Sequence, residues 1–475
     1  MLLVTGFGDA EKGGETLINL DMIGRIHFVG IGGAGMSGIA KVLIEMGHPV
    51  SGSDINDSET VHKLQAIGAK IFIGHRKENV EGAAAIVTST AITKANPEVI
   101  AAQEKTIPIF HRSDMVAALM QAKYGIAVAG AHGKTTTTSM VAIALEHAGI
   151  SPTVLVGGEL DFLHGNAKLG TGEHLVAEAD ESDGSFLKFS PRIAIVTNIE
   201  NDHMDYYQTM ENMLGAFSKF LKKLPSNGLA VLCFDNANVR QVSQDLDAPV
   251  ISYGLDYPAD VTATNITSRG ATTRFDVIFQ GANLGTVELQ VPGRHNVLNS
   301  LAAIAVGLHL GLAFQSIAAG LLLFKGAKRR FQTKGRVDGV WIVDDYAHHP
   351  TEITTTLLAA RDTDPKRLIC IFQPHRYTRT QLLRAEFGRA FYPADVLVLT
   401  DIYAASEDPI PGISGETLKD EVESQTKQRV TYIADKNKIA RYLAEIVESG
   451  DLVMTMGAGN VYQIGEELLE TLTDR

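Results

Sequence analysis

The sequence predicts an α/β protein built from three domains. Its 475 residues are too many for a single hydrophobic core. Short apolar runs alternate with helix-like stretches almost to the end, which is typical of parallel sheets with right-handed crossovers. Between residues 261 and 292 the pattern changes to alternation with turn glycines, which predicts an antiparallel ribbon. We expect an extension at 1–22, a Rossmann-like domain at 23–122, a central domain at 123–333 and a second Rossmann-like domain at 334–475.

The expected elements follow from these apolar runs. In the first domain the predicted buried strands are 25–32, 49–54, 69–73, 85–89 and 107–110. In the central domain they are 126–129, 174–179, 193–198 and 229–234, and a long helix at 296–310 follows the ribbon. In the last domain they are 340–343, 368–372, 396–399, 430–433 and 452–456. Residues 121–123 and the Lys/Arg/Gly-rich stretch 325–335 are the predicted junctions.

Composition excludes several classes of protein. The net charge of −13 argues against nucleic acid as the main partner. No apolar run approaches the length of a membrane span, and the first residues lack a secretory signal, so we expect a cytoplasmic protein without membrane insertion. Cys233 and Cys370 stand in apolar runs and are expected to be reduced core residues. The sequence leaves a monomer and a dimer both open.

The stretch 130–137 (GAHGKTTT) predicts a phosphate-binding loop, because it connects an apolar strand to a helix. Such a loop points backbone N–H groups and a helix N-terminus at a phosphate. Lys134 adds a cation, and Thr135 a hydroxyl for Mg²⁺. The strict motif requires glycine at the position of Val128. The rest of the motif still favours a triphosphate site over an ordinary glycine turn. The expected nucleotide-binding residues are Gly130, Ala131, His132, Gly133, Lys134, Thr135 and Thr136.

A second glycine loop, 30–35 (GIGGAG), follows the first predicted strand, and Asp54 ends the next one. This arrangement predicts a dinucleotide or nucleotide diphosphate at a helix N-terminus. Alone it would favour an NAD-dependent oxidoreductase over a nucleotide-sugar protein or a structural turn. An oxidoreductase has no need for a triphosphate loop, however. Two different nucleotides are therefore expected, and an NAD-dependent dehydrogenase stays as a remote alternative.

Acidic clusters follow two strands of the central domain, at 178–183 (EADESD) and within 197–205. They are placed to hold Mg²⁺ near the triphosphate, although a helix cap or a solvated loop is the alternative for any one of them. Further along, Asn296 and Asn299 lie one helical turn apart and can offer amides to a purine, unless Asn296 is an N-cap. Arg330 could reach the γ-phosphate or belong to a solvated linker.

Charged side chains also follow two strands of the last domain, within 344–350 (DDYAHHP) and 373–380 (QPHRYTRT). Arginine suits a carboxylate or a phosphate, and aspartate or histidine suits an amine that must lose a proton. These stretches are dense in such groups for a structural surface.

Together the motifs resemble the Mur ligases of peptidoglycan synthesis. The resemblance runs from residue 23 onward and rests on eight segments in order: 30–38 (GIGGAGMSG), 130–138 (GAHGKTTTT), 178–183 (EADESD), 201–205 (NDHMD), 294–299 (RHNVLN), 329–331 (RRF), 344–350 (DDYAHHP) and 373–380 (QPHRYTRT). One departure is Ala131, where the family commonly has threonine; the backbone donors should be unaffected. The carbamylated lysine of sister ligases has no secure counterpart here.

The resemblance implies an ATP- and Mg²⁺-dependent ligase with three domains. It implies that L-alanine is joined to the lactyl carboxylate of UDP-N-acetylmuramate through an acyl phosphate, with a recycling ligase that adds a murein tripeptide as the alternative. The implied UDP-sugar residues are Gly32, Gly33, Ala34, Gly35, Asp54, Ser89 and Arg112. The implied metal ligands are Thr135, Glu178 and His203, and the adenine contacts are Asn296 and Asn299. The implied catalytic residues are Lys134, Arg330, Asp345, His348, His375, Arg376 and Arg379.

Overall fold

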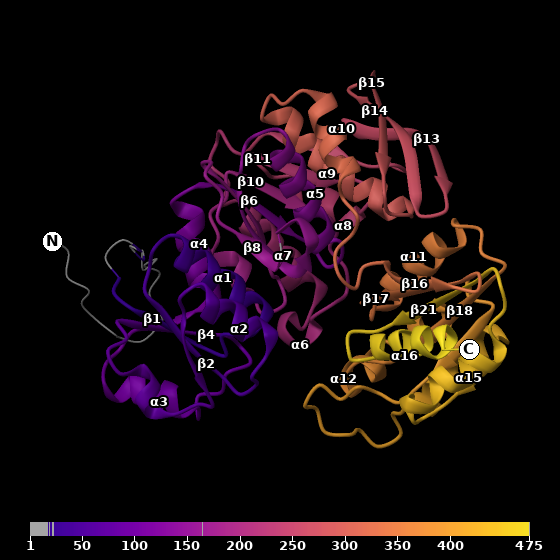
Figure 1. The fold of residues 1–475 in the computed structure, drawn as a ribbon. Coiled ribbons are helices and arrows are strands. Elements are labelled where there is room, and N and C mark those ends of the chain that lie inside the picture. The colour runs from indigo at the N-terminus through magenta and orange to yellow at the C-terminus, as the bar shows by residue number, and fades with distance from the viewer. Residues whose placement is uncertain (1–17, 19, 21–22, 164, 475) are drawn as a thin grey trace. The chain divides into compact units, whose positions relative to one another are not determined.

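The structure is a computed structural model that describes residues 18, 20, 23–163 and 165–474 (Figure 1). The expected extension at 1–22 therefore lies almost entirely outside the described residues. The chain divides into two compact units, 1–123 and 124–475. Each is described by itself. The first holds one sheet and the second holds two, so the α/β class with its three sheets is as predicted.

The first unit is a five-stranded parallel sheet with the order β3-β2-β1-β4-β5, and its five strands were all predicted. Because β1 lies in the middle, its apolar residues are fully buried. The strands are β1 (Ile26–Val29), β2 (Val50–Asp54), β3 (Lys70–Ile73), β4 (Ala85–Thr88) and β5 (Ile109–His111). The helices are α1 (Ala34–Glu45), α2 (Glu59–Ala66), α3 (Pro97–Glu104) and α4 (Arg112–Gln121).

The second unit begins with a ten-stranded sheet of order β15-β14-β13-β12-β11-β10-β6-β9-β7-β8. Its predicted strands are present as β6 (Tyr124–Ala129), β9 (His174–Glu178), β10 (Ile193–Val196) and β11 (Leu229–Cys233). Three further strands were not predicted from the sequence: β7 (Thr153–Leu160), β8 (Gly165–Lys168) and β12 (Val250–Tyr253). The first two are a bulged antiparallel pair at the sheet edge, and their glycines and polar residues hide the strand pattern.

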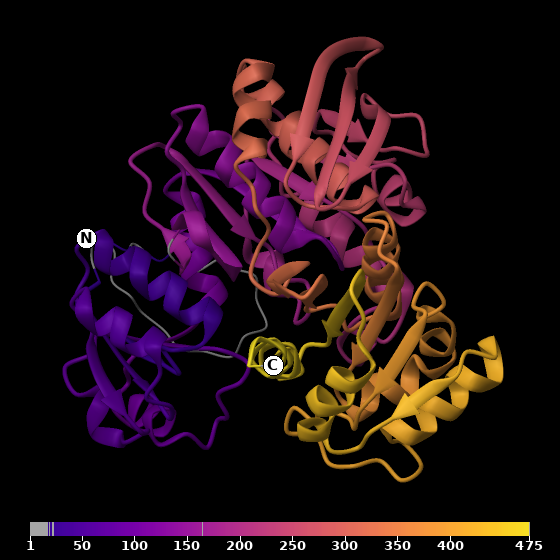
Figure 2. The same cartoon turned by 45° about the vertical axis from the view of Figure 1, so that its right-hand side comes forward.

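The predicted antiparallel ribbon is present and extends this sheet as β13 (Val261–Arg269), β14 (Thr272–Phe279) and β15 (Ala282–Leu289). Figure 2 shows it at one end of the sheet, beside α10. The predicted long helix is α9 (Arg294–His309), which packs against α5 (Lys134–His147). The other helices are α6 (Met204–Tyr207), α7 (Met210–Leu221), α8 (Ala237–Val242) and α10 (Phe314–Leu322).

The last sheet has the order β16-β17-β21-β18-β19-β20. Five of its strands were predicted: β17 (Val340–Asp345), β18 (Arg367–Phe372), β19 (Val396–Leu399), β20 (Val430–Tyr432) and β21 (Asp451–Met456). The expected junction at 325–335 overlaps a sixth, β16 (Gln332–Val337), which pairs antiparallel with β17. Lys334, Gly335 and Arg336 make this edge strand look like a linker in the sequence.

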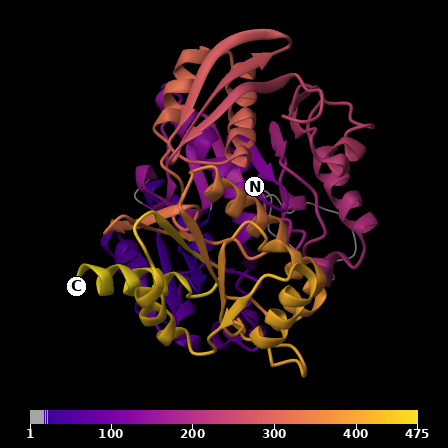
Figure 3. The same cartoon turned by 90° about the vertical axis from the view of Figure 1, so that its right-hand side faces the viewer.

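Helices cover both faces of this last sheet, and each face buries its own apolar cluster (Figure 3). They are α11 (Pro350–Arg361), α12 (Tyr377–Leu382), α13 (Arg384–Ala390), α14 (Gly415–Thr426), α15 (Ile439–Ile446) and α16 (Tyr462–Thr473). Because β17, β18 and β21 are parallel, Asp345 and Phe372 stand at the same edge of the sheet as Met456. The predicted polar segments that follow β17 and β18 therefore meet there.

Candidate active site

The phosphate loop depends on two glycines with positive φ. Gly133 (φ 81°) begins α5, and a Cβ there would lie 2.7 Å from Asn299 Oδ1. Gly130 (φ 136°) follows β6, and a Cβ there would lie 2.1 Å from Thr197 Oγ1. Any side chain would be both strained and obstructed at these positions. The tight turn brings the loop against the end of β10 and the start of α9.

Part of the loop's backbone is already bonded to the segment after β10. The N–H groups of Ala131 and His132 donate to the backbone and side-chain oxygens of Asn198, at 3.2 and 2.8 Å. The hydroxyl of Thr197 donates to the His132 carbonyl at 2.6 Å. These bonds fix the shape of the loop. The Thr137 N–H donates to the Gly133 carbonyl at 2.9 Å, so the hydrogen-bond ladder of α5 begins there, and the N–H groups before it are the helix N-terminal donors that suit a phosphate.

Lys134 lies folded over its own loop. Its Nζ donates to the carbonyl of Gly130 at 2.6 Å and to Glu181 Oε1 at 2.8 Å. Burial opposes its charge, but the carboxylates of Glu181 and Asp180 outweigh that effect and raise the pKa of Lys134. The ammonium group therefore stays charged within the loop.

Two buried carboxylates after β9 fit a divalent cation. Glu178 lies beside the Thr135 hydroxyl and the Gly157 N–H, and its Oε1 is buried with no hydrogen bond within the described structure. Oε2 of Glu181 is buried and unbonded in the same way. Burial raises the pKa of both groups. Hard oxygen donors that lack a proton donor are the ligands Mg²⁺ prefers, so these residues fit the predicted ion.

His203 lies beside this acidic cluster. It begins α6 in a left-handed conformation, with φ 55°. Its Nε2 is 3.7 Å from Glu181 Oε1 and 3.6 Å from Asp202 Oδ2. The structure thus places Thr135 with Glu178, and His203 with Glu181.

The two asparagines of α9 face the phosphate loop. Asn296 donates to the Pro292 carbonyl at 2.7 Å, and Asn299 accepts from the Thr137 hydroxyl at 3.2 Å. The N-cap of α9 is Gly293, so the N-cap alternative for Asn296 is excluded. Both side chains line a pocket of about 190 Å3 that also receives groups from the last sheet. The lining includes His132, Gly133, Thr135, Asn296, Asn299, Arg330, Asp345 and Glu352.

Arg330 and Asp345 enter this pocket from the chain around β16 and β17. Arg330 Nη1 is 3.4 Å from Glu352 Oε1, and its guanidinium lies over the ring of Tyr346. Asp345 is buried, and its two oxygens accept the N–H groups of Phe331 and Ala347 at 2.7 and 2.8 Å. Burial raises the pKa of Asp345 to about 6 despite the nearby arginine. Its observed contacts hold the loop that presents Arg330.

Histidines and arginines gather at the ends of β17 and β18. His348 Nδ1 lies 3.0 Å from the Tyr346 carbonyl, which leaves Nε2 as the acceptor in the neutral ring. Burial lowers the pKa of His348 to about 3 and that of His375 to about 4, so both rings are neutral at pH 7. Arg379 is 3.3 Å from His375 and forms an ion pair with Asp202 at 3.8 Å. Arg376, with φ 70°, begins α12 beside them.

The first unit brings together most of its predicted residues. Asp54 Oδ2 accepts the Gly32 N–H at 2.9 Å, so Asp54 orients the glycine loop. A Cβ at Gly35 would lie 3.1 Å from Arg112 Nη1, which places this guanidinium at the start of α1. Gly33 is the N-cap of that helix, and Ala34 is its first residue. Ser89 follows β4, the neighbour of β1, at the same edge of the sheet.

Family models match nearly the whole chain. The Mur ligase family catalytic domain matches residues 25–124, the Mur ligase middle domain matches 128–307, and the Mur ligase glutamate ligase domain matches 329–459.

The chain belongs to the Mur ligase family.

Curated relatives match almost the whole length of this Mur ligase. A protein of Geotalea daltonii named UDP-N-acetylmuramate–L-alanine ligase is 52% identical over 452 residues, which are 95% of this chain and 99% of that protein. A protein of the same name from Pelotomaculum thermopropionicum is 49% identical over 456 residues, 96% of this chain and 99% of that one.

Solved structures agree with the fold. The UDP-N-acetylmuramate-alanine ligase of Thermotoga maritima has a TM-score of 0.80 at 30% identity, and covers 95% of this chain and 99% of its own. A murein peptide ligase of Psychrobacter arcticus has a TM-score of 0.68 at 26% identity, with the same coverage. Membership of this ligase family removes the NAD-dependent dehydrogenase alternative. Among the described residues of this Mur ligase, none of the helices has the length and apolar character that a membrane-spanning helix needs.

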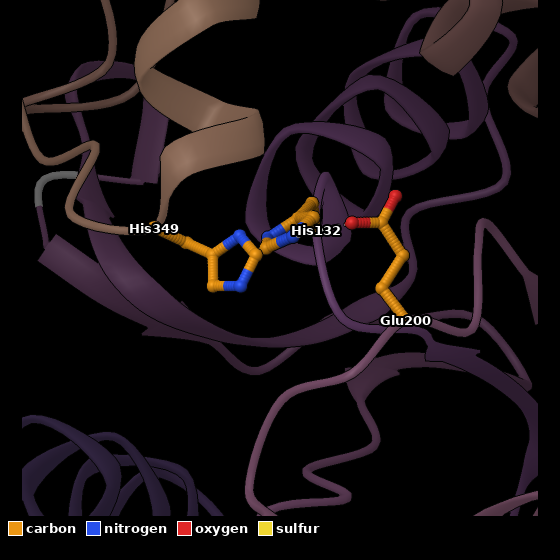
Figure 4. Close-up of side chains that lie close together, drawn as sticks. All are labelled: His132, Glu200 and His349. Carbon is orange, nitrogen blue, oxygen red and sulfur yellow. Dashed lines mark ion pairs between the residues drawn. The ribbon is translucent and has the colours of Figure 1, made fainter. Parts of the chain in front are cut away.

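Two imidazoles and a carboxylate in this Mur ligase form a cluster with metal-ligand chemistry. One ligand atom each of His132, Glu200 and His349 lies within 4.8 Å of the others (Figure 4). However, His132 already lies 3.3 Å from Glu200 and 3.3 Å from Glu352. Burial disfavours its charge, but the two carboxylates outweigh burial and raise the pKa of His132 to about 10. A proton on His132 therefore supplies the positive charge, and a metal would have to displace it.

Four residues that the site of this Mur ligase brings together received no individual role from the sequence: Asn198, Glu181, Glu200 and Glu352. The first three lie within the segments 178–183 and 197–205, which were expected as a whole to border Mg²⁺. Glu181 was within a quoted motif, but nothing in the sequence distinguished it from its acidic neighbours. Glu352 is the third residue of α11 and completes a capping box with His349. The box spacing in 349–352 (HPTE) was the available signal. The roles of all predicted site residues stay predictions.

Proposed function

We propose that this Mur ligase is an ATP-dependent enzyme that joins L-alanine to the lactyl carboxylate of UDP-N-acetylmuramate in peptidoglycan precursor synthesis. Curated relatives of that name, about half identical over 95% of the chain, support this assignment. The cytoplasm, where ATP and UDP-sugars are made, is the proposed location.

The observation that carries the proposal is the shared pocket of the second unit. The phosphate loop and the asparagines of α9 line one part of it, and Arg330, Asp345 and Glu352 line another. A site that only bound ATP would not need side chains from a second sheet. This arrangement suits transfer of an activated group between substrates held by different sheets.

In the first step an oxygen of the lactyl carboxylate attacks the γ-phosphorus of ATP, the bond to the bridging oxygen breaks, and ADP leaves. Lys134 and Arg330 neutralise negative charge on the transferring group. Bound at Thr135, Glu178 and His203, Mg²⁺ would neutralise further charge on the phosphates. Asn296 and Asn299 hold the adenine.

In the second step the amine of L-alanine attacks the acyl carbon, loses a proton, and phosphate leaves. In this proposal His348 or Asp345 accepts that proton. Arg376 and Arg379, beside the neutral ring of His375, form the cationic end of the site, which suits the carboxylate of alanine. In the first unit, Gly32, Gly33, Ala34, Gly35, Asp54, Ser89 and Arg112 hold the UDP.

Phosphate release with ATP, UDP-N-acetylmuramate and a panel of amines tests this function, with the product weighed by mass spectrometry. We expect product with L-alanine, and compare it with glycine, L-serine and the murein tripeptide. Preference for the tripeptide would overturn the assignment in favour of the recycling activity.

A further inference from the structure

Glu352 occupies an unusual position for a helix-capping residue. It is the third residue of α11, and its Oε2 accepts the N–H groups of His348 and His349 at 3.1 and 3.4 Å. The His349 side chain in turn accepts the Thr351 N–H, which completes the capping box. This half of the carboxylate fixes the backbone of the segment that carries His348.

The other oxygen of Glu352 points to the central sheet's side of the pocket. Oε1 lies 3.3 Å from Nδ1 of His132 in the phosphate loop and 3.4 Å from Nη1 of Arg330. The side chain is 10% exposed. A capping glutamate at a helix start is ordinarily solvated, and helix capping needs only one of its oxygens.

Glu352 contacts three groups that each have a predicted role in the reaction, whereas a structural ion pair joins groups without such roles. His132 belongs to the triphosphate loop, Arg330 is the predicted γ-phosphate contact, and His348 is the predicted acceptor of the amine proton. Glu200 holds His132 from the other side at 3.3 Å. Among the described residues, Glu352 is the side chain that contacts all three groups directly.

We propose that Glu352 is a positioning residue that couples the ATP end of the site to its amino-acid end: one oxygen orients His132 and Arg330, and the other orients the 348–349 backbone. This inference rests on the proposed function and adds to it a residue without predicted contact to substrate. Loss of the Glu352 charge should release His132 and Arg330 and weaken the bonds to the 348–349 backbone, while the bonds to Thr197 and Asn198 keep the phosphate loop in shape.

The test replaces Glu352 with glutamine, which keeps an acceptor for the helix cap but turns an uncharged group toward His132 and Arg330. We expect kcat to fall about 10- to 100-fold, the range expected for a charged hydrogen bond, and KM for L-alanine to rise. The Kd of ATP should change by less than about threefold, because α5 and its N-terminal N–H groups are unaltered. A purely structural residue would instead lower thermal stability without this split between kcat and ATP affinity.

The matched control is Glu416→Gln, an exposed first-turn acid of α14 in the same sheet domain. It should leave kcat and the KM values for ATP and L-alanine unchanged. A double-mutant cycle with His132→Gln tests the contact between His132 and Glu352. The kcat of the double variant should be little lower than that of the worse single variant. The proposal would be overturned if the two losses in kcat multiply in the double variant, or if kcat and KM are unchanged in the Glu352→Gln enzyme.

The same cycle, measured as thermal stability without substrates, separates this proposal from the proposed function. If the effects of the two substitutions on thermal stability are coupled, the contact between His132 and Glu352 is supported even if L-alanine proves the wrong substrate. Zero coupling removes the link even if the alanine product forms.

Discussion

The ammonium group of Lys134 and the carboxylate of Glu181 are joined by a 2.8 Å hydrogen bond inside the phosphate loop. Glu181 is 1% exposed and lies within 3.7 Å of His203. One buried carboxylate therefore faces both the predicted phosphate-binding lysine and a predicted metal ligand. The positive charge of Lys134 is thus balanced by Glu181, and the side chain is held folded over the loop by Glu181 and the Gly130 carbonyl.

Lys134→Ala should abolish turnover while UDP-sugar binding stays intact. The variant removes a cation that would neutralise the transferring phosphoryl group, an effect of about 100-fold or more on kcat. Phosphate release measures turnover, and calorimetry measures binding of UDP-N-acetylmuramate. Lys168→Ala, which breaks an ion pair with Glu146, is the control. Loss of both functions in a folded Lys134 variant would contradict two separate nucleotide sites.

His203→Ala should raise the Mg²⁺ concentration needed for half-maximal activity. The side chain borders the buried carboxylates that fit the ion, so its loss leaves the ion with fewer partners. A Mg²⁺ titration of phosphate release at saturating substrates measures the shift. His147→Ala, at the exposed end of α5, should leave the titration unchanged. An unshifted curve for the His203 variant would remove it from the metal site.

Gly133→Ala should weaken ATP binding more than it weakens the fold. Alanine at φ 81° costs about 1 kcal/mol in strain, and its methyl group would also meet Asn299 Oδ1 at 2.7 Å. Gly149→Ala is a close control, because Gly149 has φ 82° with nothing within 4 Å of an added Cβ. Gly133→Ala should lose at least as much thermal stability as Gly149→Ala, and only Gly133→Ala should lose nucleotide affinity. Equal ATP affinity in the two would show that the contact with Asn299 is unimportant.

Glu98 should make the first unit acid-sensitive. This carboxylate is fully buried and accepts from Ser53 at 2.6 Å, beside His27 at 3.5 Å. Burial opposes its charge, but His27, Ser53 and Asn79 outweigh burial and lower the pKa of Glu98 to about 2.

Because the pKa of Glu98 is lower in the folded state, its ionised carboxylate stabilises the fold at pH values above the unfolded pKa near 4.5. That contribution to stability is lost as the pH falls toward 2. The shift corresponds to about 3 kcal/mol. Urea unfolding of wild type and Glu98→Gln should therefore differ by roughly this amount at pH 7 and converge between pH 4.5 and pH 2. A difference independent of pH would contradict the ionised state of Glu98.

Much of the site could be predicted because its residues follow strands directly. The loop 130–137, the acids after β9 and the arginines after β18 are local patterns, each readable from a few neighbouring residues. The partners of these groups are not local. Glu352 meets His132, and Asp202 meets Arg379, because separate sheets present them to each other. No spacing in the sequence records those contacts.

The sequence by itself determined the α/β class, the three sheets, most central strands and the two nucleotide loops, since buried strands are continuous apolar runs and glycine loops have fixed spacing. Only the tertiary structure decided that β16 is an edge strand, that Gly293 rather than Asn296 caps α9, and that Glu181 and Glu352 are the buried partners of Lys134 and His132. These features depend on which charges share a desolvated space, and that is settled by packing between segments far apart in the chain.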